Sequence, residues 1–111
     1  KIIYCTNDEM ALGAYQAVEG QQKTDDIFII GFDGSPDALK SIKDGKLGAS
    51  LAQKPIEMGF KGVEALQTLL DGGTVDSTIY TSTQIVDAAN VETFEADLNA
   101  QMEKAAAAAK K

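Results

Sequence analysis

The amino-acid sequence predicts an α/β fold built around a parallel sheet. Strand-like and helix-like segments alternate four times along the 111 residues, which is the order expected of right-handed parallel crossovers. One strand-like segment, residues 27–30, is an uninterrupted apolar run. Such runs are typical of parallel strands that are covered on both faces of the sheet. Residues that favour turns and helix caps mark the boundaries between the segments.

The first strand is expected over residues 2–6, because the chain is apolar there up to Cys5. A capping box runs from Thr6 to Glu9 and predicts a helix that begins after Thr6 and ends at Gly20. Its buried face is expected from four residues at helical spacing, Met10, Ala14, Ala17 and Val18. A polar loop over residues 21–26 leads to the second strand at residues 27–30.

The second strand ends in a turn that starts a short helix. Glycines in the segment 31–34 allow the backbone to turn, Ser35 is placed to cap the helix, and Pro36 suits the first helical position. The apolar residues of this helix are Ala38, Leu39 and Ile42. Gly45 is expected to end it, and a third strand follows over residues 47–52.

The second half of the chain contains the most amphipathic segment. Pro55 opens a predicted helix and Gly72 ends it. Its apolar stripe comprises Ile56, Phe60, Val63, Leu66, Leu69 and Leu70. Residues 78–86 are rich in β-branched side chains and predict a long strand. Asn90 is expected to cap a last helix that carries Val91, Phe94, Leu98 and Met102.

Two further expectations concern side-chain burial and the end of the chain. Met10, Met58 and Phe60 stand at helical spacings and are expected in the core. The last helix is expected to continue as a helical tail through the alanines of residues 105–109 to Lys110 and Lys111, because alanine is the best helix former and lysine suits the negative end of a helix.

Composition excludes several classes of function. The formal net charge of −7 argues against nucleic acid as a partner, since phosphate binding requires a clustered positive surface. The absence of histidine and the single cysteine, Cys5, exclude histidine-based zinc sites, Cys/His nucleophile pairs and an internal disulfide. No serine stands in a nucleophile-elbow context, and the segment 31–34 matches neither phosphate-loop spacing. The sequence therefore predicts a non-enzymatic protein without a metal or other cofactor.

Polar side chains follow three of the predicted strands. Asn7 comes after the first strand, Asp33 after the second and Gln53 after the third. Ligands of open parallel sheets bind beyond the carboxyl ends of the strands, and amide and carboxylate groups together supply the donors and acceptors that a polyol needs. Each residue also has a purely structural interpretation. Asn7 can cap a helix, Asp33 can organise a turn, and Gln53 can be an ordinary surface residue.

Several ordered segments resemble the periplasmic sugar-binding proteins of the ribose-binding type, the type I solute-binding proteins of ABC importers. The resemblance is carried by NDEMALGA at residues 7–14, GFDGSPDA at residues 31–38 and DGKLGASLAQKP at residues 44–55. Shorter matches continue at residues 58–59 and 62–64, and the likeness extends from Lys1 to about Val91. Lac-repressor-type relatives usually carry a second acid where this chain has Gly34.

The resemblance implies two Rossmann-like lobes with a monosaccharide, a pentose or a hexose, in the cleft between them. Residues 1–53 would be part of the C-terminal lobe, and residues 54–82 would contribute a helix and a strand to the N-terminal lobe. Residues 83–90 would return to the C-terminal lobe, and residues 91–111 would form a C-terminal helical tail. By position in the motifs, Asn7, Asp33 and Gln53 match sugar-contacting residues, with Gln53 at the hinge.

The resemblance also implies partners and a location. A membrane permease, and in some family members a chemoreceptor, recognises the closed form, and the upstream N-terminal portion of the same protein would complete the site. The implied location is periplasmic or otherwise extracytoplasmic, with lipid anchoring left open. The chain starts directly in a predicted core strand, which favours a piece of a longer protein.

Two alternative functions stay open at this point. One is the effector-binding core of a lac-repressor-type transcription regulator, which shares the fold; a DNA-binding headpiece upstream of Lys1 would favour it, and a signal peptide would not. The other is an excised half-protein that associates with itself through exposed lobe edges. The sequence does not distinguish among the sugars.

Overall fold

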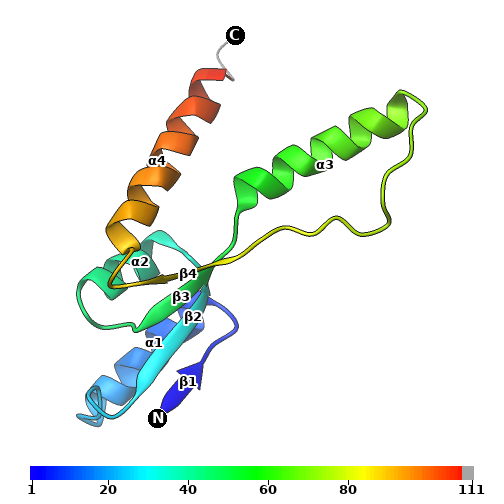
Figure 1. The fold of residues 1–111 in the computed structure, drawn as a ribbon. Helices are drawn as coiled ribbons and strands as arrows, with labels where there is room; N and C mark the ends of the chain where they lie inside the picture. The colour runs from blue at the N-terminus through cyan, green and yellow to red at the C-terminus, as the bar shows by residue number, and fades with distance from the viewer. Residues whose placement is uncertain (109–111) are drawn as a thin grey trace.

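A computed structural model describes residues 1–108 of the chain and shows a four-stranded sheet with four helices (Figure 1). In chain order the elements are β1 (Ile2–Tyr4), α1 (Asp8–Gly20), β2 (Phe28–Asp33), α2 (Pro36–Lys43), β3 (Ala49–Ala52), α3 (Pro55–Leu70), β4 (Gln84–Asp87) and α4 (Val91–Ala108). The predicted α/β class is therefore confirmed. Residues 109–111 of the predicted helical tail lie outside the described residues, and α4 reaches Ala108.

The sheet has the order β1-β2-β3-β4 and is parallel only in its first three strands. β4 runs antiparallel to β3, with Ala52 opposite Gln84 and Ala49 opposite Asp87. The expectation of a wholly parallel sheet is thus wrong at its last strand. The reason lies in the path of the chain, because it leaves the sheet at the carboxyl end of β3 and re-enters beside that same end after α3.

The long strand predicted over residues 78–86 is also wrong in most of its length. Only its last residues pair, as part of β4, and residues 78–83 lie outside the sheet. A strand needs a neighbour for its backbone N–H and C=O groups. Within residues 1–108, no strand runs beside this segment.

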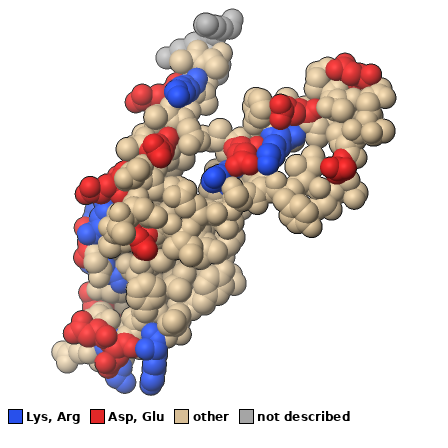
Figure 2. Space-filling model, viewed as in Figure 1, with Lys and Arg blue, Asp and Glu red and all other residues tan. Residues whose placement is uncertain are grey.

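Helices α1 and α2 pack on one face of the sheet and contact each other. The core lies between them and the sheet and includes Ile29, Leu39, Ile42 and Val86, each at most 2% exposed. The other face of the sheet is uncovered among the described residues. It carries exposed side chains of β1, β2 and β4, namely Ile2, Tyr4, Phe28 and Ile85, and its centre shows few charges (Figure 2).

The expectation that residues 27–30 are covered on both faces is therefore wrong for the described part of the chain. Ile29 faces α1 and is buried, whereas its neighbour Phe28 is 49% exposed. Alternate residues of a strand point to opposite faces, so an uninterrupted apolar run leaves half of its side chains on the open face. The sheet has an apolar surface that the described helices do not cover.

Helix α3 stands away from the sheet and reaches into solvent (Figure 1). No residue of α3, which the structure describes throughout, is buried. The radius of gyration of 17.6 Å exceeds the value of about 13 Å expected for a compact chain of this length. The prediction that Met10, Met58 and Phe60 are core residues is wrong here, since they are 57%, 43% and 65% exposed. The helical spacing is present, but the apolar stripe of α3 is exposed, with no described helix or strand to cover it, and Met10 lies on the exposed side of α1.

Some of the predicted helix caps are formed in the structure and others are not. Ser35 caps α2 by accepting a hydrogen bond from the Ala38 N–H, and Gly45 follows the helix with φ +72°. The residue that caps α1 is Asn7 rather than Thr6, so the predicted capping box is not formed. The Asn90 side chain turns back toward β4, where it accepts from the Asp87 N–H and donates to the Ile85 carbonyl.

Candidate ligand-binding site

Asp33 and Gln53 meet at the carboxyl ends of two neighbouring strands. Asp33 is the last residue of β2, and Gln53 directly follows β3. The Gln53 amide nitrogen donates a hydrogen bond of 2.6 Å to Asp33 Oδ1. Together with Pro55 and Met58 they line an open hollow of about 370 Å³. The structure thus places these two predicted site residues together, at the edge of the sheet where the sequence analysis expected them.

The backbone at Asp33 adopts an unusual, left-handed conformation. Asp33 has φ +116° and the following Gly34 has φ +74°. A Cβ on residue 34 would lie 2.6 Å from the Ala52 Cβ, so only glycine fits there. Residues other than glycine hold a positive φ only where their surroundings fix it. The Asp33 carboxylate is exposed and its Oδ2 is left for a further partner.

Asn7 has the structural role that the sequence analysis had considered for it. Its Oδ1 accepts a hydrogen bond of 2.8 Å from the Met10 N–H and caps α1. Asn7 lies beyond β1 at the same edge of the sheet, but it does not line the hollow of Asp33 and Gln53. Because the cap uses only the oxygen, the amide nitrogen keeps its two donors. A role of Asn7 in ligand binding stays a prediction.

The three residues offer complementary hydrogen-bonding groups. The Asp33 carboxylate is a pure acceptor, the Asn7 nitrogen is a pure donor, and the Gln53 amide retains an oxygen and one N–H. A hydroxyl both donates and accepts, so a polyol can bind to such a set. Charge-assisted bonds to a carboxylate are the stronger ones. Among these groups, the Asp33 carboxylate can therefore form the strongest hydrogen bonds.

Sequence reasoning missed the role of Asp8, which the sequence analysis did not single out. Asp8 is 0% exposed and accepts hydrogen bonds from the Ser35 N–H at 2.6 Å and the Ser50 hydroxyl at 2.7 Å. One signal could have pointed to it. A glycine within an apolar strand marks a close approach of another group, and a Cβ at Gly31 would collide with Asp8 Oδ1.

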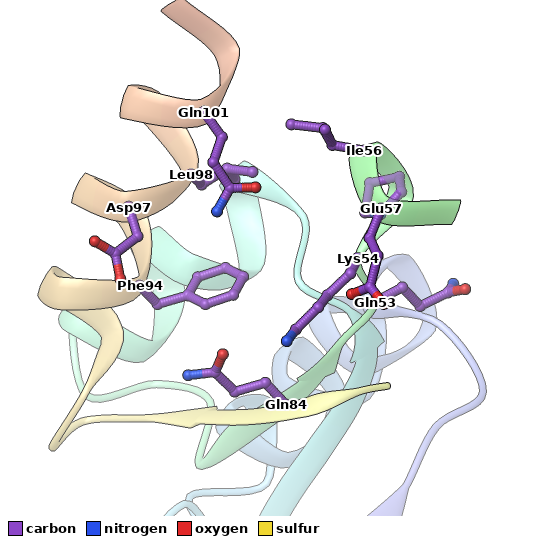
Figure 3. Close-up of a pocket in the computed structure, with 10 residues that line it drawn as sticks. Gln53, Lys54, Ile56, Glu57, Gln84, Phe94, Asp97, Leu98 and Gln101 are labelled. Atoms are coloured by element: carbon purple, nitrogen blue, oxygen red, sulfur yellow. The ribbon is translucent and has the colours of Figure 1, made fainter. Parts of the chain in front are cut away.

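A second hollow, of about 300 Å³, lies between the start of α3, β4 and α4 (Figure 3). Phe94 of α4 and Lys54 extend toward each other across it, while the Gln53 side chain extends away from Phe94. Glu57 at its rim forms an ion pair of 2.8 Å with Lys61, and this hydrogen-bonded partner lowers the pKa of the Glu57 carboxyl. This hollow is separate from the Asp33 carboxylate.

Residues 1–108 contain no group of three or more His, Cys, Asp or Glu side chains placed to hold a metal ion. Over the same residues, every helix is too short or too polar to cross a bilayer.

Comparison with known proteins identifies the family. The family description "Periplasmic binding protein domain" matches residues 1–74. The ribose import binding protein of Salmonella typhimurium LT2 is 47% identical over 75 residues, which cover 68% of this chain and 25% of that protein. Its counterpart in Bacillus subtilis 168 is 49% identical over 77 residues, with coverage of 69% and 25%. The chain therefore spans about a quarter of the length of these relatives.

Solved structures agree with this assignment. An ABC transporter solute-binding protein from Actinobacillus succinogenes 130z, crystallised with D-allose, superposes with a TM-score of 0.77 and 27% identity, covering 83% of this chain and 32% of that chain. A solute-binding protein from Bacillus halodurans C-125 with bound myo-inositol gives a TM-score of 0.75 and 34% identity, with coverage of 86% and 33%. With a partial type I fold and a matching family description over 74 residues, the chain belongs to the periplasmic binding proteins, a non-enzymatic family, and is similar in sequence to its ribose-type members.

Proposed function

We propose that the chain is the C-terminal portion of a solute-binding protein that captures a monosaccharide between two lobes and delivers it to an ABC importer. The observation that carries this proposal is the Asp33–Gln53 pair at the carboxyl edge of the sheet. The names of the relatives support a sugar as the ligand, since they are described as binding ribose or allose. A permease partner, recognition by a chemoreceptor and a periplasmic location belong to the same proposal.

The division into lobes is supported by surfaces that lack a cover. We assign residues 1–53 to the C-terminal lobe, residues 54–82 to the N-terminal lobe, residues 83–90 to the return crossing and residues 91–111 to the tail. The side chains of the apolar stripe of α3 are 37% to 74% exposed, with Phe60, Val63 and Leu70 the most exposed. Fully burying one such side chain stabilises by about 1.5–3 kcal/mol. If an upstream portion packs on α3 and on the open sheet face, several such side chains are buried, and each of them stabilises the complete protein by about this amount.

The same arrangement suggests how binding is coupled to closure. A sugar favours the closed conformation only to the extent that it contacts both lobes in that conformation. Asp33 lies in the sheet, whereas Gln53 stands where the chain leaves the sheet toward α3. A ligand that takes the place of Asp33 as the partner of Gln53 would therefore connect the sheet to the crossing segment.

A chimera tests the proposal. In it, this chain replaces the matching quarter of the Bacillus subtilis ribose import binding protein, so that the missing lobe surfaces are supplied. We expect calorimetric titration to show saturable binding of D-ribose, D-allose or D-fructose, with a dissociation constant in the micromolar range or below. A well-folded chimera that releases no heat with any pentose or hexose would contradict the proposal.

Self-association is a second candidate, because the uncovered sheet face and α3 are both apolar. Large exposed apolar surfaces mark interaction sites. If copies of the chain cover one another, sedimentation of the isolated 111-residue chain should show a folded homo-oligomer. A chain that aggregates or is largely unfolded would instead favour the upstream portion as the natural cover.

A further inference from the structure

Asp8 and Ser50 form a buried polar network beneath the candidate site. Asp8 is the first residue of α1, and Ser50 lies in β3; both are 0% exposed. Asp8 Oδ1 accepts the Ser50 hydroxyl at 2.7 Å, and the Ser50 oxygen accepts the Gly34 N–H at 3.1 Å. Asp8 Oδ2 accepts the Ser35 N–H at 2.6 Å. Burying a carboxylate is costly unless hydrogen bonds compensate for the lost hydration. The bonds from Ser35 and Ser50 provide this compensation for Asp8.

The network acts on the two residues that follow Asp33. Gly34 is held by Ser50, and Ser35 is held by Asp8. Both N–H groups are therefore fixed at the turn where the chain passes through φ +116° at Asp33 and φ +74° at Gly34. A residue such as Asp33 keeps a positive φ only when neighbouring contacts determine it. The hydrogen bonds to Gly34 and Ser35 are contacts of this kind.

We propose that Asp8 is a positioning residue that holds the Asp33 carboxylate in its ligand-binding orientation. This inference rests on the proposed function of Asp33. Asp8 itself is fully buried and does not reach the hollow that Asp33 and Gln53 line. Its effect on a ligand is transmitted through the Gly34 and Ser35 amides.

Asp8→Asn tests the proposal in the chimera. The asparagine has the same shape, but its NH₂ group cannot accept a hydrogen bond. Depending on how the amide is oriented, either the Ser50 hydroxyl or the Ser35 N–H is therefore a buried donor without its acceptor. We expect sugar affinity to fall about tenfold, as for the loss of one well-placed hydrogen bond. Glu9→Gln is the matched control, because Glu9 lies in the same first turn of α1 and is exposed. It should change affinity less than about twofold.

A double-mutant cycle separates positioning from a general loss of stability. If Asp8 acts through Asp33, Asp8→Asn should change affinity less than about twofold in an Asp33→Ala background. An equal loss in both backgrounds would overturn the proposal. Ser50→Ala is a milder variant that removes the link to Gly34 and keeps the bond from Ser35 to Asp8. It should lower affinity about threefold.

Hydrogen exchange measured on the folded chimera without sugar is a test that is independent of sugar binding. Asp8→Asn should speed hydrogen exchange of the Gly34 and Ser35 amides at least about tenfold, with the Ile29 amide in β2 unaffected. If the unmodified chimera binds no sugar, the proposed function fails while this exchange experiment still decides whether Asp8 orders the turn. Unchanged exchange at both amides would overturn the positioning role.

Discussion

In the chimera, Asp33→Ala should lower sugar affinity at least about tenfold. A hydrogen bond from a sugar hydroxyl to an ionised carboxylate contributes about 1.5–3 kcal/mol to binding. Every 1.4 kcal/mol corresponds to a factor of ten in the dissociation constant. Asp33 is suited to this role because its carboxylate is exposed at the sheet edge. Gln53 binds Oδ1, so Oδ2 can accept a hydrogen bond from the sugar. Asn7→Ala and Gln53→Ala should each cost less, since they remove neutral amides. Calorimetric titration of each variant measures these differences.

Two further variants test whether another cause could explain the loss of affinity in Asp33→Ala. Alanine at φ +116° is strained, so Asp33→Asn, which tolerates positive φ better, separates the carboxylate from the backbone. The full loss should persist in Asp33→Asn. Asp37→Ala removes an exposed carboxylate from the first turn of α2 and should leave affinity within about twofold. Unchanged affinity in Asp33→Asn would remove the carboxylate from the site.

The features that were predictable from the sequence are those set by local chemistry. Ser35, Pro36 and Gly45 bound α2 as expected, because capping and turn formation depend on residues a few positions apart. The meeting of Asp33 and Gln53 was also predictable, since parallel strands end at one edge of the sheet. The first rule involves only neighbouring residues, and the second only the parallel order of adjacent strands.

The predictions that were wrong depend on contacts between distant segments. Residues 78–83 have the composition of a strand but no neighbouring strand within the described chain. Phe60 has the spacing of a core residue but lies on the exposed apolar stripe of α3, which no described helix or strand covers. Periodicity shows which face of an element is apolar and not what packs against it. The burial of Asp8 was signalled only indirectly, by Gly31 in β2, because it requires β2, β3 and α1 to converge.

Gly31→Ala should strongly destabilise the fold. Gly31 is buried in β2, and a Cβ there would collide with Asp8 Oδ1 and lie 3.2 Å from the Ala11 Cβ. Asp8 cannot move aside without breaking its bonds to Ser35 and Ser50. Overpacking costs about 1–3 kcal/mol, and a buried group left without its partner costs a similar amount. We expect a loss of about 2–4 kcal/mol, measured by urea unfolding of the chimera.

Gly13→Ala is the matched control, and its effect should have the opposite sign. Gly13 lies in the exposed middle of α1, where a Cβ would meet no atom within 4 Å. Alanine there should stabilise by about 0.5–1 kcal/mol, because glycine is the poorer helix former. The contrast isolates the Asp8 carboxylate as the cause. If Asp8→Ala, which removes that carboxylate, makes Gly31→Ala no better tolerated, then the close approach of β2 to Asp8 is not what requires glycine.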